Sequence, residues 1–233
     1  MTVDLWSMPI PVMAPASLAL QATLSPSELE RAARFIAADK RSEFITCRGA
    51  LRILLARYLD QSPESVALST LPGGKPTLAD PQGLFFNLAH TTGLMLVAIA
   101  RGMPVGVDVE KVRPVEGASQ ITSRYFSAHE RADMTNDPSS FLRLWTRRES
   151  ALKALGLGIS AGWDSLQIIP RSTDTADALG PQKNCHIRLL TPRAGYVAAV
   201  SAVASHFDLC LKPALEFTAL ELAGFTDDHL TAH

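Results

Sequence analysis

The sequence predicts an α+β fold, in which helices and strands occupy different stretches of the chain. Signals for helices dominate the stretch before residue 60, whereas short β-like runs fill the middle and the end. Residues 93–100 and 195–202 also resemble each other in composition. This internal echo permits a pseudo-duplicated arrangement of two similar α+β halves.

Two helices are expected before residue 60. Residues 25–28, Ser-Pro-Ser-Glu, form a capping box with proline at the first helical position, which predicts a helix over residues 26–38. Apolar residues at three- and four-residue spacing predict a second helix over residues 41–59. Such a helix commonly has a solvated basic face, which here would consist of Arg41, Arg48 and Arg52.

The rest of the chain predicts strands around one more helix. Asp137 and Pro138 are favourable starting residues and Gly156 is a favourable end, which predicts a helix between them. The polar stretch 172–182 is expected to be a loop. Apolar runs predict strands over residues 85–88, 94–100, 105–109, 166–169, 186–190, 196–202 and 207–211.

Composition narrows the class of protein. The chain has 233 residues, 47% of them hydrophobic, which is enough to bury a core without staples. Its formal net charge of −1 offers no general attraction for nucleic acid, so an anionic ligand would need a local basic cluster. Three cysteines without metal-like spacing predict free thiols in a reducing compartment. Without a membrane-spanning run or a signal-peptide pattern, we expect a cytoplasmic protein with no membrane partner.

Two carboxylates, Asp108 and Glu110, lie in the sequence Gly-Val-Asp-Val-Glu at residues 106–110. Alternate residues of a strand share a face, so both acids should point to one side and the valines into a core. Like charges so close raise each other's pKa unless a cation lies between them, and oxygen ligands suit Mg²⁺ or another hard divalent ion. The same pattern is also typical of an edge strand with a polar outer face.

The helix expected after Asp137 carries an unusual stripe. Phe141, Trp145, Glu149 and Lys153 recur every four residues and therefore share one face. A Glu–Lys pair on a solvated helix, worth ~0.2–0.5 kcal/mol, would explain the two charges but not why they continue an aromatic face. A packed stripe would aim both charges inward, where they need partners. A metal ion for Glu149 and a phosphate for Lys153 would satisfy them.

Two weaker signals precede these residues. His90 ends a predicted strand, and the turn Gly73-Gly74-Lys75 could form a backbone nest for a phosphate. A lone histidine is also common as a core or surface residue, and a Gly-Gly-Lys segment is also common as an ordinary turn.

Together these segments resemble the 4′-phosphopantetheinyl transferases of the surfactin-synthetase-activating type. The match runs from about residue 25 to residue 169, in the family's order, and is thin beyond. Each motif is weak alone, but five in register are a strong signal. They are G-K-P at 74–76, F-N-x-S-H at 86–90, G-[IV]-D-[IV]-E at 106–110, F-[FS]-x-x-E at 126–130 and W-x-x-K-E-[AS]-x-x-K at 145–153.

The resemblance implies an enzyme that transfers the phosphopantetheine of coenzyme A to a serine of an apo acyl or peptidyl carrier protein. Adenosine 3′,5′-bisphosphate would be the by-product, and Mg²⁺, or Mn²⁺ in its place, the cofactor. It further implies a monomer with two similar α+β subdomains, residues 1–103 and 104–233, and the active site in the cleft between them. A Mg²⁺-dependent phosphoesterase and a non-catalytic coenzyme A or carrier-protein binding module stay open as alternatives.

By position, the resemblance also implies roles for individual residues. Asp108, Glu110 and Glu149 would bind the metal, and Asp108, Glu149 and Lys153 would be catalytic, with Glu149 or a metal-bound water as the base. The residues expected at coenzyme A are Lys40, Arg48, Gly74, Lys75, Pro76, Ala89, His90 and Lys153. Two departures from the motifs bear on coenzyme A affinity, since Arg148 replaces the usual Lys and Ala89 the usual Ser.

The carrier protein is expected to dock on residues 113–126, which directly follow the strand that bears the acids. This segment mixes apolar and basic side chains, which suits a small acidic helical partner. The expected contact residues are Arg113, Ile121, Arg124 and Phe126.

Overall fold

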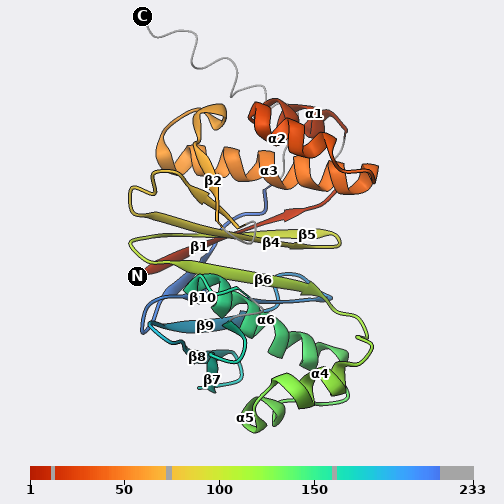
Figure 1. The fold of residues 1–233 in the computed structure, drawn as a ribbon, viewed down its shortest axis with the longest axis vertical. Coiled ribbons are helices and arrows are strands. Elements are labelled where there is room, and N and C mark those ends of the chain that lie inside the picture. The colour runs from red at the N-terminus through yellow and green to blue at the C-terminus, as the bar shows by residue number, and fades with distance from the viewer. Residues whose placement is uncertain (12–13, 72–74, 159–161, 216–233) are drawn as a thin grey trace, which may run out of the picture. The chain divides into compact units, whose positions relative to one another are not determined.

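The computed structural model describes residues 1–11, 14–71, 75–158 and 162–215. The chain divides into two compact units, a larger one of Met1–Ser7 and Thr70–Pro213 and a smaller one that consists mainly of Met8–Ser69. The mixed α+β class is confirmed (Figure 1). These units are not the two subdomains expected from the sequence, and the boundary at residue 103 stays a prediction.

The smaller unit is mainly helical. The predicted capping box is present, with the Ser25 hydroxyl accepting from the Glu28 amide and the Glu28 carboxylate accepting from the Ser25 amide. The first predicted helix is shorter than expected and the second begins earlier, while an additional helix precedes both. The elements are α1 (Ala14–Ala22), α2 (Pro26–Ala33), α3 (Ala38–Leu59) and the 3₁₀ helix η1 (Pro63–Ser65).

The basic row on α3 is not a solvated face, so that expectation is wrong for two of its three arginines. Arg52 is buried and donates from Nε to Glu28 at 2.7 Å, and from its NH1 group to the Pro63 carbonyl oxygen at 2.8 Å. Arg48 pairs with the same carboxylate at 3.5 Å. Glu28 therefore joins α2 to α3 through two arginines, whereas Arg41 is exposed.

The larger unit contains two sheets. A four-stranded sheet has the order β11-β1-β5-β4 and a five-stranded antiparallel sheet the order β6-β10-β9-β8-β7. The first consists of β1 (Thr2–Pro9), β4 (Leu84–Thr91), β5 (Leu94–Arg101) and β11 (Asp208–Leu211). The second consists of β6 (Val105–Lys111), β7 (Gln167–Pro170), β8 (Thr175–Leu179), β9 (Asn184–Leu190) and β10 (Tyr196–Ala202). Two short strands, β2 (Leu68–Thr70) and β3 (Pro76–Leu78), lie between η1 and β4 in the chain.

Helix α6 (Pro138–Leu155) packs against the five-stranded sheet, next to β6, β10 and β9 (Figure 1). Its ends are those predicted, because Asp137 caps the first turn and Gly156 terminates the helix with a φ of 71°. Two shorter helices, α4 (Ala118–Tyr125) and α5 (Ala128–Arg131), lie between β6 and α6 in the chain. Packing against the sheet thus determines which face of α6 is buried.

The predicted strands are present, with ends that differ by up to three residues. The predicted loop over residues 172–182 is wrong, because it contains β8. The inward positions of β8 are Ala176 and Ala178, which are buried but only weakly apolar. Their alternation with polar residues is therefore a faint signal in the sequence.

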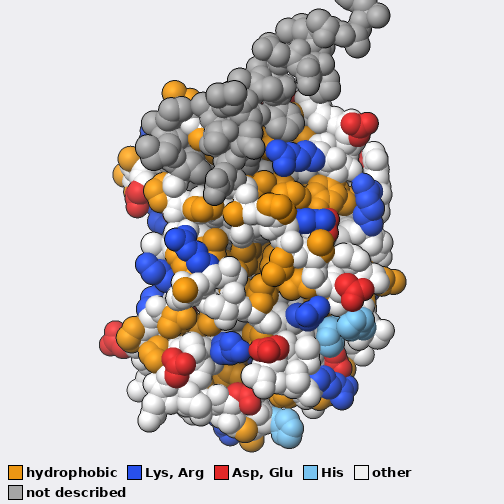
Figure 2. Space-filling view, turned by 180° about the vertical axis from the view of Figure 1, so that it is seen from behind, with side chains coloured by type: hydrophobic (Ala, Val, Ile, Leu, Met, Phe, Trp, Pro, Cys, Tyr) orange, Lys and Arg blue, Asp and Glu red, His pale blue; other side chains and the backbone are white. Residues whose placement is uncertain are grey.

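The predicted free thiols are confirmed, since Cys47, Cys185 and Cys210 form no disulfide. Burial raises the pKa of both Cys47 and Cys185 to about 12. No helix among the described residues is long and apolar enough to cross a membrane. Figure 2 shows a face on which basic, acidic and apolar side chains are interspersed.

Candidate active site

Strand β6 and helix α6 approach each other closely at Gly106. A Cβ atom at this position would overlap the carbonyl oxygen of Ser150 and come within 2.5 Å of the Ala154 amide nitrogen. Only glycine allows the helix to sit this near to the strand. The approach brings Lys153 on α6 alongside Asp108 on β6.

Asp108 is 8% exposed and forms an ion pair with the side chain of Lys153. Its Oδ1 accepts a hydrogen bond of 2.7 Å from the Lys153 ammonium, which also donates to the Val107 carbonyl oxygen. The other oxygen, Oδ2, is buried without a hydrogen-bond partner. Burial raises the pKa of Asp108, although Lys153 opposes that shift.

Glu149 is 5% exposed and its Oε1 is also buried without a hydrogen-bond partner. Burial raises the pKa of this carboxyl, Lys153 lowers it, and the charges of Asp108 and Glu110 raise it further. The expected inward direction of the stripe is confirmed. Lys153, however, bonds to Asp108 across the interface of strand and helix and does not serve as a surface partner for Glu149.

Glu110 is less buried than Asp108 and pairs with Arg113 at 3.4 Å. Burial raises its pKa, Arg113 lowers it, and the neighbouring Asp108 raises it. Among the described residues, no three His, Cys, Asp or Glu side chains gather closely enough to form a ready metal site. The three valines that alternate with the two acids are buried in the core, as predicted; they are Val105, Val107 and Val109.

Asn87 on β4 positions the acidic strand, a role that the sequence did not reveal. Its buried side-chain oxygen accepts a hydrogen bond of 2.8 Å from the Val107 amide, one residue before Asp108. The F-N-x-S-H motif contained this residue, but only the structure shows which strand it reaches.

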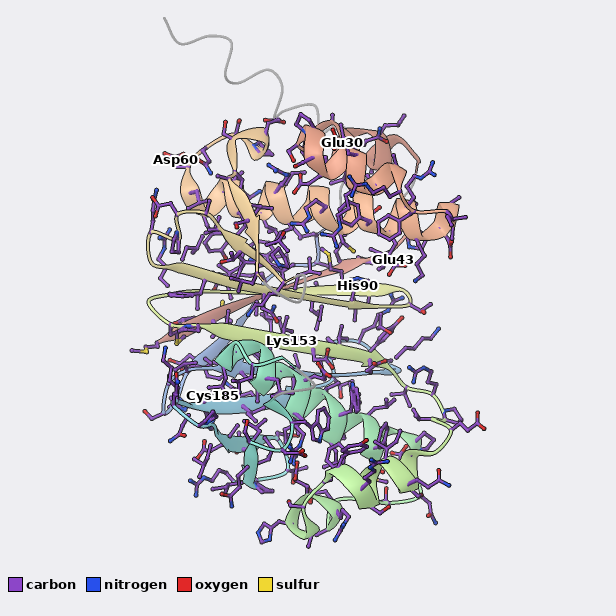
Figure 3. All side chains as sticks on the ribbon, in the orientation of Figure 1. Glu30, Glu43, Asp60, His90, Lys153 and Cys185 are labelled. Atoms are coloured by element: carbon purple, nitrogen blue, oxygen red, sulfur yellow. The ribbon has the colours of Figure 1, made fainter. Side chains whose placement is uncertain are left out.

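The residues expected at coenzyme A within the larger unit have different surroundings. Lys75 donates from Nζ to the Lys153 carbonyl oxygen at 2.6 Å, and burial, with the nearby Lys153 charge, lowers its pKa to about 8. His90 is exposed on β4 (Figure 3), whereas the side chain of Ala89 is buried in the core. Pro76 begins β3, and Gly74 lies outside the described residues.

Two further residues expected at coenzyme A belong to the smaller unit. Lys40 is exposed and pairs with Glu43 at 2.8 Å, while Arg48 is held by Glu28. Their place at the ligand stays a prediction.

The expected carrier-contact residues differ in exposure. Arg113 and Arg124 are exposed, and Arg124 lies over the Tyr125 ring. Ile121 is half-buried on α4. Phe126 is 4% exposed and packs edge-on against Trp163, so its side chain belongs to the core of the unit.

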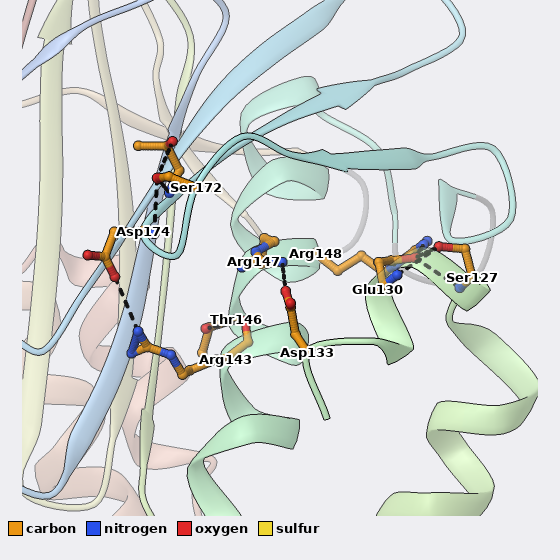
Figure 4. Close-up of polar contacts among 10 residues, drawn as sticks. Ser127, Glu130, Asp133, Arg143, Thr146, Arg147, Arg148, Ser172 and Asp174 are labelled. Carbon is orange, nitrogen blue, oxygen red and sulfur yellow. Dashed lines mark hydrogen bonds and ion pairs between the residues drawn. The ribbon is translucent and has the colours of Figure 1, made fainter. Parts of the chain in front are cut away.

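Arg148 has a structural task that accounts for its departure from the motif's usual lysine. Its Nε and NH2 groups donate to the two oxygens of Glu130 at 3.1 and 2.8 Å (Figure 4). Its NH1 group donates to the carbonyl oxygens of Trp163 and Leu166. Glu130 also accepts from the Ser127 amide in a capping box. A planar guanidinium can make all these bonds at once and a lysine cannot. Arg148 is thus committed to the fold, and its effect on coenzyme A affinity stays a prediction.

A family model described as the 4′-phosphopantetheinyl transferase superfamily matches residues 104–201. This range runs from the start of β6 to β10 and includes Asp108, Glu110, Glu149 and Lys153. The family match therefore covers the part of the chain that carries the two buried acids, Asp108 and Glu149.

Curated relatives extend the match beyond that range. The chain is 35% identical to the 4′-phosphopantetheinyl transferase HetI of Nostoc sp. over 78% of its own length and 84% of the relative's. It is 26% identical to the 4′-phosphopantetheinyl transferase Sfp of Bacillus subtilis over 79% and 84% of the two chains. The chain belongs to the 4′-phosphopantetheinyl transferase family, as its motifs predicted, and is a transferase.

Proposed function

We propose that this protein transfers the 4′-phosphopantetheine of coenzyme A to a serine hydroxyl of an apo acyl or peptidyl carrier protein, releasing adenosine 3′,5′-bisphosphate. The observation that carries the proposal is the pair of buried, unpartnered carboxylate oxygens, Asp108 Oδ2 and Glu149 Oε1, in the range matched by the family. Buried acceptors without donors are costly in a folded protein. Their presence supports a site that is completed by a ligand.

The donor set fits a hard divalent cation. Asp108, Glu110 and Glu149 offer oxygen ligands, and the charge of Asp108 raises the pKa of both glutamates. A cation would relieve this repulsion and satisfy the two orphaned oxygens. We therefore assign Mg²⁺ binding to these three carboxylates, with Mn²⁺ as a substitute; the ion would neutralise charge on the pyrophosphate.

The reaction is a displacement at phosphorus, so the protein mainly positions groups and stabilises charge. Glu149 takes the proton of the attacking serine hydroxyl, directly or through water. Lys153 and Lys75 lie together at the carboxyl-terminal end of α6 and neutralise phosphate oxygens as the bond to the leaving group breaks. His90, the backbone around Pro76 and Ala89, and the basic residues Lys40 and Arg48 complete the coenzyme A contacts.

We further propose that residues 1–103 and 104–233 are two related α+β subdomains, with the active site in the cleft between them. The echo noted in the sequence supports this proposal, because its two copies are β5 and β10, both buried along almost their entire length. Each is preceded by a glycine with a positive φ, 88° at Gly93 and 80° at Gly195. The two segments thus share a turn as well as a composition.

The carrier protein is assigned to the surface that follows β6, with Arg113, Ile121 and Arg124 as direct contacts and Phe126 as their support from the core. The mixture of cationic and apolar groups favours an acidic helical partner. A monomer is expected, as the resemblance to the surfactin-synthetase-activating type implies.

The decisive experiment is intact-mass measurement of several purified apo carrier proteins incubated with the enzyme, coenzyme A and Mg²⁺. The expected result is the mass increase of one phosphopantetheine, together with release of adenosine 3′,5′-bisphosphate. Reactions without carrier and reactions with a carrier whose serine is replaced by alanine serve as controls. Cleavage of coenzyme A without carrier would instead identify a phosphoesterase, and tight binding without any product would identify a binding module.

A further inference from the structure

A pocket of about 600 Å³ lies beside the first turns of α6, apart from Asp108, Glu110 and Glu149. Its basic lining comes from Arg143 and Arg147 on α6 and from Arg171 just after β7. Arg143 and Arg147 are four residues apart and share a helix face, whereas Arg147 and Glu149 are two apart and point in nearly opposite directions. The pocket is therefore separate from the candidate active site.

The guanidinium of Arg147 is buried and only partly satisfied. The residue is 3% exposed, and its Nε is buried without a hydrogen-bond partner. Its NH1 group contacts the Asp133 carboxylate at 3.2 Å, but that side chain is 51% exposed (Figure 4). A buried charge is expensive unless it is both paired and hydrogen-bonded. Arg147 thus has the capacity for a second anionic partner.

The other two arginines also retain donors. Arg143 uses one amino group for Asp174 at 3.2 Å, and Arg171 uses Nε for Asp177 at 2.7 Å. Each guanidinium has five N–H donors in a planar fork. The start of α6 itself adds little, because Asp137 already accepts from the Ser139 amide and hydroxyl. The arginine side chains, and not the helix terminus, make this pocket attractive to an anion.

We propose that this pocket binds the phosphoryl dianion of a small phosphorylated molecule, with Arg147 and Arg143 as its main ligands and Arg171 at its rim. A guanidinium fork matches phosphate oxygens and bonds them in pairs, which makes arginine the preferred residue for such ligands. The volume lies within the range of small-molecule sites. The motif that contains Arg147 leaves this position open, so the proposed transferase activity does not require the pocket.

The test is calorimetric titration of inorganic phosphate into the full chain, with ionic strength held constant by sodium chloride. We expect saturable binding that Arg143→Gln weakens by about tenfold or more, the usual effect of losing a charge-assisted hydrogen bond. Arg193→Gln, which changes an exposed arginine elsewhere in the larger unit, should bind as the wild type does. Arg143 carries the test because replacing the buried Arg147 risks unfolding the protein.

Two further variants make the result specific. Asp133→Asn removes the carboxylate that competes for Arg147, so phosphate should bind more tightly, an effect that a merely structural role for the pocket would not produce. Lys75→Gln, which alters the proposed coenzyme A site, should leave this phosphate binding unchanged. Absence of saturable binding, equal affinity in Arg143→Gln and wild type, or loss of binding in Lys75→Gln would overturn the proposal.

Discussion

Helix α6 contributes to two ion pairs that differ in burial and in how many of their polar atoms are hydrogen-bonded. In the pair of Arg148 and Glu130, both carboxylate oxygens accept hydrogen bonds and the guanidinium reaches two further carbonyl oxygens. In the pair of Lys153 and Asp108, one carboxylate oxygen is bonded and the other has no partner. Each pair thus joins a basic residue of α6 to a carboxylate, but only the carboxylate of Glu130 has both oxygens hydrogen-bonded.

This difference distinguishes an ion pair that stabilises the fold from one that is available for binding and catalysis. A saturated pair has no capacity for a ligand, and removing either partner exposes the other to the full cost of a buried charge. An unsaturated pair keeps capacity for a substrate or a cation, at some cost to the stability of the ligand-free protein. We expect substitutions at the first pair to affect folding, and substitutions around the second to affect turnover.

The largest effect is expected at Glu149. Glu149→Gln keeps the shape of the side chain but removes its charge and proton affinity, so the rate of carrier loading should fall by ~10²–10⁴. The melting temperature of the metal-free protein should hold or rise, because repulsion with Asp108 and Glu110 is relieved. Glu30→Gln on the exposed surface of α2 is the matched control. Near wild-type loading by Glu149→Gln would remove this residue from the mechanism.

The reverse pattern is expected at Arg148. Arg148→Met leaves Glu130 charged and buried, which should lower the free energy of unfolding by about 3–5 kcal/mol, measured by urea denaturation. The double variant Arg148→Met with Glu130→Leu should recover much of this loss because no unpaired charge remains. If Arg148→Met were as stable as wild type yet loaded carrier poorly, Arg148 would belong with the chemistry.

A smaller effect concerns protons exchanged when coenzyme A binds. The pKa of Lys75 is lowered to about 8 in the free protein, and a phosphate nearby should raise it again. Binding near that pH should therefore take up protons, a fraction of one per site, which calorimetry in buffers of different ionisation enthalpy can detect. Lys75→Gln should abolish the uptake. Equal uptake in this variant would show that another group titrates.

The smallest effect is a pH dependence of stability. The pKa of Glu149 is raised in the folded protein above its ordinary 4.5, so this carboxyl favours folding below that pH and opposes folding as pH rises through the folded pKa. Measured in chelator, the stability of Glu149→Gln relative to wild type should grow as pH rises above 4.5. A relative stability that stays flat or declines would contradict the raised pKa.

The sequence predicted what local chemistry determines. Caps and apolar runs located α6 and the strands that carry the acids, and the four-residue period of Glu149 and Lys153 predicted their inward direction. The alanine alternation of β8 and the helix α1 were missed, because neither has a strong local pattern.

Contacts between distant residues could not be predicted from the same signals. The spacing of the sequence indicated Glu149, four residues earlier, as a partner of Lys153. The structure instead pairs Lys153 with Asp108, 45 positions earlier. The bonds from Asn87 to β6 and from Arg148 to Glu130 likewise join segments whose proximity depends on the whole packing of the unit. Motifs indicated which residues matter, and the tertiary structure supplied their partners.

The unequal burial of the three thiols has a practical consequence. Alkylating reagents attack the thiolate, and the raised pKa values of Cys47 and Cys185 keep both sulfurs protonated and enclosed at neutral pH. Cys210, half-exposed on β11, is then the site at which a maleimide dye would attach. The natural sequence thus already offers a single attachment point for fluorescence measurements of carrier encounter, without any engineered cysteine.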